Sequence, residues 1–296
     1  MTCCVPVRNS APEAERRCAA IPDVCVRSIS PMTIPFLITA RLSSVRLPKK
    51  LLRELDGTEV VSKVIERGIA GFGREQVILC TSPLATDDEL VEVAQRHGIG
   101  VHRGHPIDIL DRLAGACRSV GAAGFVGQTG ENPIFSVEHC LRIRDAIAAG
   151  RDLVRFNDLP IGCSPYGISR AAIETLIELK EEEDTGFWGY LLNRPEVFDV
   201  EFMAPDDDDR MPGIRLTVDH PEDLELMRAI FTELPGMPAV RDVVALLRRR
   251  PELLRINAHR VQLDMPEEDK ARINAFFARR GDALRERLAY HRRPTW

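Results

Sequence analysis

The amino-acid sequence predicts a layered α/β domain with a largely parallel sheet. From residue 34 onward, short apolar runs alternate with amphipathic segments, which is typical of parallel strands joined by helices. With 296 residues, of which 44% are hydrophobic and 29% are charged, the chain can bury one large core or two modest ones. Together these observations favour an ordinary globular α/β protein.

The expected strands are short apolar runs bounded by turn-forming residues. They lie at 36–39, 76–80, 100–102, 124–128, 152–156, 197–202 and 215–217. The expected helices have apolar residues at helical spacing, at 60–70, 86–96, 106–118, 137–149, 170–181 and 221–231. Right-handed crossovers would bring the carboxyl ends of the strands to one edge of the sheet, where ligands of such sheets bind.

Both ends of the chain depart from this alternation. Residues 1–31 show no sustained period, so we expect a floppy extension, and Met32 is a second candidate start of translation besides Met1. After residue 234 the sequence is helical, at 240–249 and 270–291. The predicted organisation is an N-terminal extension (1–31), a main domain that carries the function (32–234) and a helical C-terminal extension (235–296).

The last predicted helix carries an apolar stripe that other parts of the protein must cover. Its members are Phe276, Phe277, Leu284 and Leu288. We expect this stripe to fold back on the core, and a homodimer interface stays open as the alternative.

Charge and hydropathy exclude several classes of partner. The formal net charge of −5 argues against nucleic acid, because proteins that bind it usually carry a basic face, whereas single nucleotides remain possible. No apolar run approaches the ~20 residues of a membrane span. The N-terminus has Arg and Glu where a signal peptide needs an apolar stretch. We therefore expect a cytoplasmic protein with no membrane partner.

The eight cysteines include no Cys-x-x-Cys pair, which disfavours a structural zinc site or a disulfide framework. Four lie in the N-terminal extension and four are scattered through apolar contexts, so we expect reduced thiols packed as small apolar residues. Cys163, in a loop, is a candidate nucleophile, but no histidine stands near it in the sequence and the packing role is favoured.

Residues 40–50 follow the first expected strand and concentrate positive charge. They contain Arg41, Arg46, Lys49 and Lys50, besides two serines and a proline. A chain that leaves the carboxyl end of a buried strand can turn backbone N–H groups toward an anion, while Arg and Lys supply mobile positive charge. Because the Gly-rich spacing of a Walker loop is absent, the segment predicts a triphosphate site of another kind.

Four ordered segments resemble one enzyme family. The pattern Ala-Arg-x-x-Ser-x-Arg-Leu-Pro-x-Lys at 40–50 is similar to the nucleotide-binding signature of the acylneuraminate and 3-deoxy-manno-octulosonate cytidylyltransferases, most of all the spore-coat-polysaccharide type. The segments 129–134, 215–224 and 251–259 follow in the family's order. The resemblance implies a three-layer Rossmann-like nucleotidyltransferase fold, of the nucleotide-diphospho-sugar transferase type, that transfers CMP from CTP to an acceptor and expels pyrophosphate.

The resemblance also implies which residues bind the nucleotide. They are Ala40, Arg41, Leu42, Ser43, Ser44, Arg46, Lys50, Thr81, Asp111 and Arg112. Nucleotidyl transfer needs cations on the β and γ phosphates, because negative charge grows on the departing pyrophosphate. Arg41 and Lys50 fit this catalytic role, with Arg46 as a helper.

The reaction also calls for a divalent metal held by carboxylates, and Mg²⁺ is the expected cofactor. Glu131 and Asp219, each placed after an expected strand, fit this demand. The family has aspartate where this chain has Glu131, so an altered metal position or lost activity stays open. Asp219 could instead cap the helix that Pro221 opens, but the cap alone leaves its coincidence with Glu131 unexplained, which favours the metal role.

Acceptor recognition is expected between residues 157 and 190, where 157–168 is polar and loop-forming. Lys49 replaces a glycine of the family and His105 replaces a serine. The candidate acceptor contacts are Lys49, His105, Asn157, Ser164 and Tyr166. Because the subgroup's Arg-Gly-x-Asp-x-Glu stretch is absent, the acceptor is predicted only as a small anion: a sugar acid such as a nonulosonic acid, or a phosphonate or phosphate.

Two other classes of protein stay open. A nucleotide-sugar-dependent glycosyltransferase also has a Rossmann-like sheet, but its carboxylates come as Asp-x-Asp and the Arg-Leu-Pro-x-Lys loop is not expected there. A non-catalytic nucleotide-binding relative would explain Glu131 and Lys49 as drift. Release of pyrophosphate from CTP would exclude the non-catalytic relative, and release of a nucleoside diphosphate from a nucleotide sugar would support the glycosyltransferase.

Overall fold

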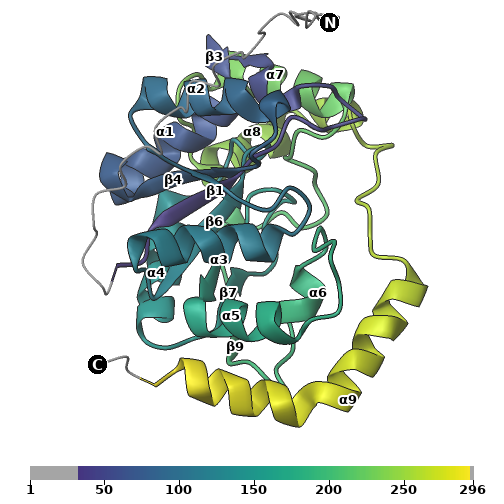
Figure 1. The fold of residues 1–296 in the computed structure, drawn as a ribbon. Helices are drawn as coiled ribbons and strands as arrows, with labels where there is room; N and C mark the ends of the chain where they lie inside the picture. The colour runs from purple at the N-terminus through teal and green to yellow at the C-terminus, as the bar shows by residue number, and fades with distance from the viewer. Residues whose placement is uncertain (1–32, 294–296) are drawn as a thin grey trace, which may run out of the picture.

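The computed structural model describes residues 33–293, and its centre is a seven-stranded sheet (Figure 1). The strand order is β5-β4-β1-β6-β8-β7-β9, and β8 runs antiparallel to both neighbours while the other pairs are parallel. The strands are β1 (Phe36–Thr39), β4 (Val77–Thr81), β5 (Gly100–Arg103), β6 (Gly124–Thr129), β7 (Leu153–Phe156), β8 (Tyr166–Ser169) and β9 (Val200–Met203). A separate two-stranded ribbon joins β2 (Glu54–Leu55) to β3 (Thr58–Glu59).

Helices cover both faces of the sheet and give it three layers. In β1, Phe36 and Ile38 belong to one core and Leu37 to the other, because successive side chains of a strand point to opposite faces. The first core packs against α1 (Val60–Phe72), α2 (Asp88–His97), α4 (Val137–Ala148), α7 (Pro221–Glu233) and α8 (Val240–Arg249). The second packs against α3 (Ile109–Val120), α5 (Arg170–Leu179), α6 (Gly189–Leu192) and α9 (Glu267–His291). The predicted α/β fold class is therefore confirmed.

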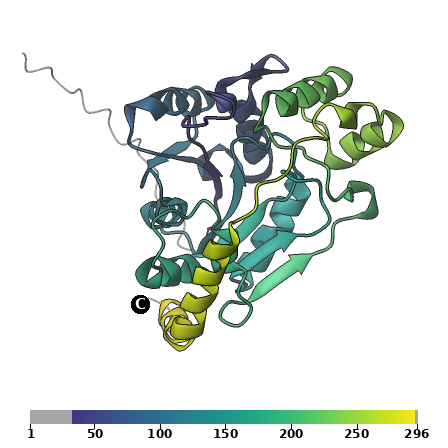
Figure 2. The ribbon, with the colours of Figure 1, turned by 90° about the vertical axis from the view of Figure 1, so that its right-hand side faces the viewer.

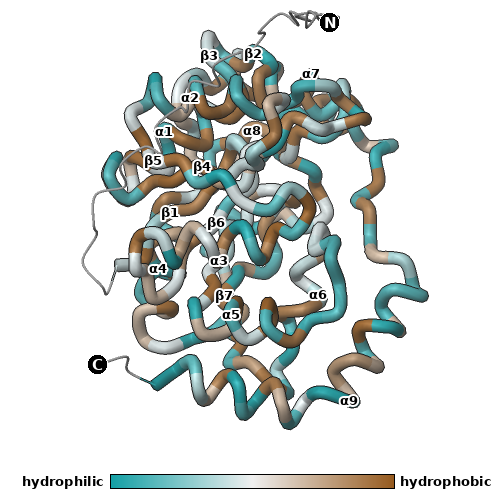
Figure 3. The backbone as a smooth tube through the Cα atoms, in the orientation of Figure 1, coloured by the Kyte–Doolittle hydropathy of each residue, from teal (hydrophilic) through white to brown (hydrophobic). Residues whose placement is uncertain are grey.

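The C-terminal helix α9 folds back on the core, as expected. The four residues of its apolar stripe are buried in the second core, and the helix packs against α5. Figures 1 and 2 show α9 running past α5, and in Figure 3 its turns alternate between hydrophilic and hydrophobic, as a helix with one buried side requires. No helix within residues 33–293 is long and apolar enough to cross a membrane.

Two strand predictions were wrong. The segment 215–217 is not a strand, because Arg215 makes only an isolated bridge to Ile161. Conversely, the predicted loop 157–168 runs into strand β8, whose sequence Tyr-Gly-Ile-Ser is too short and too mixed to be recognised. Gly167 belongs in this strand because a Cβ there would lie 2.4 Å from the Ile143 side chain on α4.

The cysteines of the described residues match their expected role. Cys80, Cys117, Cys140 and Cys163 are buried free thiols. Burial raises the pKa of the Cys163 thiol, so its nucleophilic thiolate is disfavoured. The other four cysteines, the predicted extension 1–31 and the candidate start at Met32 lie outside the described residues.

Candidate active site

Two cavities meet at the edge of the sheet where β1 and β6 end. Cavity A, of about 640 Å³, is bounded mainly by the loop that follows β1. Cavity B, of about 500 Å³, is bounded by the end of β6, by β7 and by the segment 157–166. Thr129 and Glu131 line both cavities. Each volume lies in the usual range of small-molecule sites, so the pair can hold two ligands that meet at Glu131.

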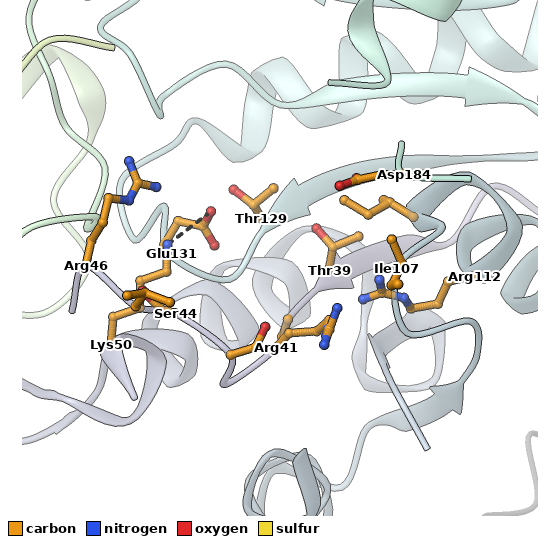
Figure 4. Close-up of a pocket in the computed structure, with 14 residues that line it drawn as sticks. Thr39, Arg41, Ser44, Arg46, Lys50, Ile107, Arg112, Thr129, Glu131 and Asp184 are labelled. Atoms are coloured by element: carbon orange, nitrogen blue, oxygen red, sulfur yellow. Dashed lines mark ion pairs between the residues drawn. The ribbon is translucent and has the colours of Figure 1, made fainter. Parts of the chain in front are cut away.

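Cavity A gathers most of the predicted nucleotide-binding residues. Those that line it are Ala40, Arg41, Ser43, Ser44, Arg46, Lys50 and Arg112. Figure 4 shows Arg46, Lys50 and Glu131 at one end of the cavity and Arg112 and Asp184 at the other. The cavity is therefore a cationic trough with a carboxylate at the end that adjoins cavity B.

A buried carboxylate that the sequence analysis did not identify holds the loop of cavity A. Asp87 is 1% exposed, and its Oδ1 accepts a hydrogen bond of 2.8 Å from the backbone N–H of Leu42. Its Oδ2 accepts from Ser82 Oγ at 2.5 Å and lies 3.8 Å from Arg41 Nε. Asp87 falls inside the predicted helix 86–96, but it ends a 3₁₀ turn before α2 and is free to point at the loop. The only sequence signal was its place near a helix start.

Lys50 joins the two carboxylates predicted as metal ligands. Its Nζ lies 2.8 Å from Asp219 Oδ1 and 3.5 Å from Glu131 Oε1. Asp219 also forms ion pairs with Arg46 at 3.0 Å and with Arg215 at 3.3 Å. Burial alone would raise the pKa of the Asp219 carboxyl, but the three cations together lower it, so Asp219 stays ionised.

The alternative role of Asp219 as a helix cap is wrong. The carboxylate that caps α7 is Asp223, whose Oδ2 accepts from the backbone N–H groups of Asp219 at 3.1 Å and His220 at 3.0 Å. Asn257, in the fourth family-like segment, donates to Asp223 Oδ1 at 2.9 Å. Asp223, supported by Asn257, therefore fixes the backbone of Asp219, and the Asp219 side chain is available to contact the cations of the site.

Glu131 and Asp219 are two carboxylates that both lie beside Lys50, and their oxygens are of the hard type that Mg²⁺ prefers. Within residues 33–293 no group of three or more His, Cys, Asp or Glu side chains is placed to hold a metal ion. Magnesium is usually bound by one or two carboxylates, with phosphate and water completing its octahedron. A carboxylate pair beside a phosphate-sized cationic trough fits such an ion when the nucleotide is also bound.

Three of the predicted nucleotide contacts do not line cavity A. Leu42 is buried in the first core and Thr81 is buried in β4. Asp111 lies 3.4 Å from Arg118 on the outer side of α3. A nearby Asp108 caps α3 by accepting from the Asp111 N–H, which explains why this helix begins later than predicted.

Two predicted acceptor contacts also point elsewhere. Lys49 adopts the left-handed conformation with φ 52°, as a glycine would, and its exposed Nζ lies 2.5 Å from Glu89 of α2. His105 is exposed, and its Nδ1 accepts from the Asp108 N–H at 2.8 Å, so the ring holds a turn. Neither residue lines cavity A or B, and the geometry gives no support to an acceptor contact by either.

The remaining predicted acceptor residues, Asn157, Ser164 and Tyr166, line cavity B. Ser164 Oγ is already bonded to the backbone of Phe156, so it holds the segment in place. Arg155 and Trp188 also line this cavity. Arg155 was missed, although one signal was available: it is a lone charge in the otherwise apolar strand Leu153–Phe156.

Comparison with known proteins gives one consistent answer. Residues 36–165 match the family model described as Cytidylyltransferase. The chain is 27% identical to the Spore coat polysaccharide biosynthesis protein SpsF of Bacillus subtilis over 229 residues, 74% of this chain and 95% of the relative. It is 34% identical to the 3-deoxy-manno-octulosonate cytidylyltransferase of Acidovorax sp. over 125 residues, 40% of this chain and 44% of the relative.

Solved structures agree on the fold. A cytidylyltransferase from Leptospira borgpetersenii superposes with a TM-score of 0.70 at 21% identity, covering 79% of this chain and all of the other. The span 36–165 that matches the family model contains β1, its loop and β6, and it supplies part of the lining of cavity B. Residues 36–165 of the chain therefore match the cytidylyltransferase family, and the spore-coat-polysaccharide protein is similar to the chain over most of its length.

Proposed function

We propose that this protein transfers CMP from CTP to a small anionic acceptor and releases pyrophosphate. The observation that carries the proposal is the contact of Lys50 with both Asp219 and Glu131 where cavities A and B meet. CTP would occupy the cationic cavity A, and the acceptor would occupy cavity B. Cytosine preference rests on the family alone.

In this reaction an acceptor oxygen attacks the α-phosphorus, a new P–O bond forms, and the bond to the departing pyrophosphate breaks. Lys50 and Arg46 both contact Asp219 Oδ1, at 2.8 and 3.0 Å. Oxygens of a bound triphosphate would compete with that carboxylate for the two cations. Lys50 and Arg46 would then hold the growing negative charge on the leaving group.

A divalent metal, when bound, neutralises phosphate charge and polarises the reacting phosphoryl group. Glu131 and Asp219 are the residues that would hold it. Asp87 would contribute indirectly by keeping the Leu42 backbone and Arg41 in place.

The acceptor class follows from the relatives and from cavity B. One relative is named for 3-deoxy-manno-octulosonate, a sugar acid, and cavity B contains a cation. We therefore place sugar acids first, with phosphonates and phosphates as the alternative acceptors.

The test is pyrophosphate release from each of the four ribonucleoside triphosphates, with Mg²⁺ or Mn²⁺ and with chelator, against sugar acids, phosphonates and phosphorylated small molecules. We expect release from CTP only, in the presence of metal and one acceptor class. Release of a nucleoside diphosphate from a nucleotide sugar would instead establish a glycosyltransferase. Binding of CTP without turnover across the panel would favour a non-catalytic relative.

A further inference from the structure

Asp184 is a carboxylate in the wall of cavity A to which the proposed reaction gives no role. Figure 4 shows it with Arg112 at one end of the cavity, and Lys50 with Glu131 at the other. Because the α-phosphorus must meet the acceptor where the two cavities adjoin at Glu131, the triphosphate of a bound nucleotide would lie at that end. The nucleoside would then lie at the end that holds Asp184.

The charge of Asp184 is not balanced within the part of the chain that the structure describes. Of the two carboxylates that line cavity A, Glu131 has Lys50 at 3.5 Å, whereas Asp184 forms no ion pair within residues 33–293. Its Oδ1 accepts from the Gly186 N–H at 2.8 Å, which orients the carboxylate, and its Oδ2 has no hydrogen-bond partner among these residues. An unpaired anion in a site for a polyanion is unfavourable unless the ligand also offers it hydrogen-bond donors.

The residue that follows Asp184 fixes this segment on helix α3. Thr185 is 1% exposed, and its Oγ1 donates to Asp108 Oδ1 at 2.9 Å and accepts from the Leu110 N–H at 3.1 Å. Lys180 Nζ lies 2.5 Å from the other oxygen of Asp108. Buried anchors on both sides of Asp184 therefore hold its backbone at the edge of the cavity.

We propose that Asp184 accepts hydrogen bonds from the ribose hydroxyls of the nucleotide, and that cavity A thereby selects ribonucleotides over 2′-deoxyribonucleotides. An ionised carboxylate only accepts hydrogen bonds, and the vicinal hydroxyls of ribose are donors. Ile107, which is 51% exposed, offers the base an apolar contact at the same end, so the carboxylate is left for the sugar. The inference rests on the proposed function for the nucleotide in cavity A, but it requires neither an acceptor nor turnover.

The test is calorimetric titration of the full chain with CTP, 2′-deoxy-CTP and UTP, each with Mg²⁺ and without acceptor. The readout is the dissociation constant of 2′-deoxy-CTP divided by that of CTP. We expect this sugar ratio to be about ten for the wild type, because a hydrogen bond to a charged group is among the stronger ones and is here partly screened by water.

Two variants that remove the same charge separate the contact from general electrostatics. Asp184→Ala should reduce the sugar ratio to about two or less. Loss of the charge also lessens repulsion of the triphosphate, but it does so equally for both nucleotides, so the ratio isolates the sugar contact. Glu183→Ala is the matched control, because Glu183 is the exposed neighbour and lines neither cavity. Its sugar ratio should stay within about twofold of the wild type, and unchanged melting would show that both variants are folded.

Variants of Thr185 test its role as a positioning residue. Thr185→Val removes the hydroxyl that contacts Asp108 and should give a sugar ratio between those of the wild type and Asp184→Ala. Thr185→Ser keeps the hydroxyl and should restore the ratio of the wild type. An unchanged ratio in a folded Thr185→Val would contradict the positioning role.

The proposal is overturned if 2′-deoxy-CTP binds the wild type as tightly as CTP, if Asp184→Ala keeps the sugar ratio, or if Glu183→Ala lowers it equally. A change in the preference for CTP over UTP at an unchanged sugar ratio would assign Asp184 to the base and also overturn it.

The outcome separates this inference from the proposed function. Selection of ribose through Asp184 in a protein that releases no pyrophosphate would support the inference and contradict the proposed function. Pyrophosphate release from 2′-deoxy-CTP as efficient as from CTP would do the reverse, and a wild type that binds no CTP would contradict both.

Discussion

Cavity A and cavity B differ in the balance of charge on their walls. The charged residues of cavity A are the cations Arg41, Arg46, Lys50 and Arg112 and the carboxylates Glu131 and Asp184. Those of cavity B are the carboxylates Glu131, Asp158 and Asp219 and the cation Arg155. A trough with excess positive charge suits a polyanion, and a site with one unpaired cation suits a single anionic group. The difference supports the proposal that the triphosphate binds in cavity A and the smaller acceptor in cavity B.

The two cavities also differ in what their charges already touch. Asp219, which lines cavity B, contacts Lys50 and Arg46 of cavity A and also Arg215. Lys50 and Arg46 can therefore bind a ligand in cavity A while Arg215 remains as a partner of the carboxylate. In cavity B the unpaired group is the cation itself. Substitutions should therefore affect turnover most in cavity A and acceptor affinity most in cavity B.

The largest effect is expected for Lys50→Ala. It removes the cation that contacts both Asp219 and Glu131, and loss of one such charge-stabilising group typically costs 10²–10³ in turnover. We expect kcat for pyrophosphate release to fall about 10³-fold. Lys49→Ala, at the neighbouring exposed position, is the control and should change kcat less than about twofold. A Lys50→Ala enzyme within tenfold of the wild type would break the assignment of cavity A.

Glu131→Gln should have the next largest effect, because it removes one of the two carboxylates where the cavities meet. We expect kcat to fall about 10²-fold and the half-saturating Mg²⁺ concentration to rise about tenfold. Glu131→Asp, which keeps the charge, should lose less activity. The measurement is turnover over a metal titration, and an unchanged metal dependence in Glu131→Gln would argue against its role as a ligand.

A smaller effect concerns the packing behind cavity B. His139 stacks on Phe156 with ring centroids 4.1 Å apart and lies 3.3 Å from Asp209. Burial lowers the pKa of His139 from its ordinary 6.5 to about 4. As pH falls, His139 therefore takes up its proton in the unfolded chain before it does so in the folded protein. The contribution of neutral His139 to the free energy of unfolding is complete above pH 6.5 and is lost as pH falls from about 6.5 to about 4.

Unfolding by urea at a series of pH values measures this loss, which we expect to be about 1–3 kcal/mol. The raised pKa of Asp209 acts in the opposite direction, so the quantity to compare is the slope of the wild type against that of His139→Leu. Equal slopes between pH 6.5 and 4 would contradict a neutral buried His139.

The smallest effect is expected for Lys49→Gly. The left-handed backbone at Lys49 favours glycine, which stabilises the folded state. Glycine also raises the conformational entropy of the unfolded chain, which destabilises the folded state. Because the two effects oppose each other, the free energy of unfolding should change by less than about 1 kcal/mol. Because Lys49 contacts Glu89 and lines neither cavity, the KM for the acceptor should not change. A change of more than threefold in that KM would instead indicate that Lys49 contacts the acceptor.

The sequence predicted cavity A better than cavity B for a physical reason. The cations of cavity A lie close together in one loop: Arg41, Arg46 and Lys50. Their pattern can therefore be recognised from the sequence without knowledge of the fold. Cavity B is assembled from separate strands, and the position of its cation Arg155 beside Tyr166 follows only once β8 is known to lie beside β7. The wrong loop prediction at 166–168 hid that register.

Long-range contacts explain the other omissions. Asp87 holds the loop of cavity A from a 3₁₀ turn that the sequence analysis included in the predicted helix 86–96. Lys49 and His105 were placed near the acceptor because of their neighbours in the sequence, but side-chain direction is decided by packing, which sends them to Glu89 and to a local turn. Glu131 and Asp219 were predicted as a pair from their places after expected strands together with the family resemblance, and the structure places both beside Lys50.

The most direct test of the division into two sites is calorimetric titration of CTP with Mg²⁺ into the wild type, Lys50→Ala and Arg155→Met. Removal of a phosphate-binding cation should weaken CTP binding at least tenfold in Lys50→Ala, and Arg155→Met should stay within twofold of the wild type. No CTP binding by the wild type, or equal loss in the two variants, would contradict the account.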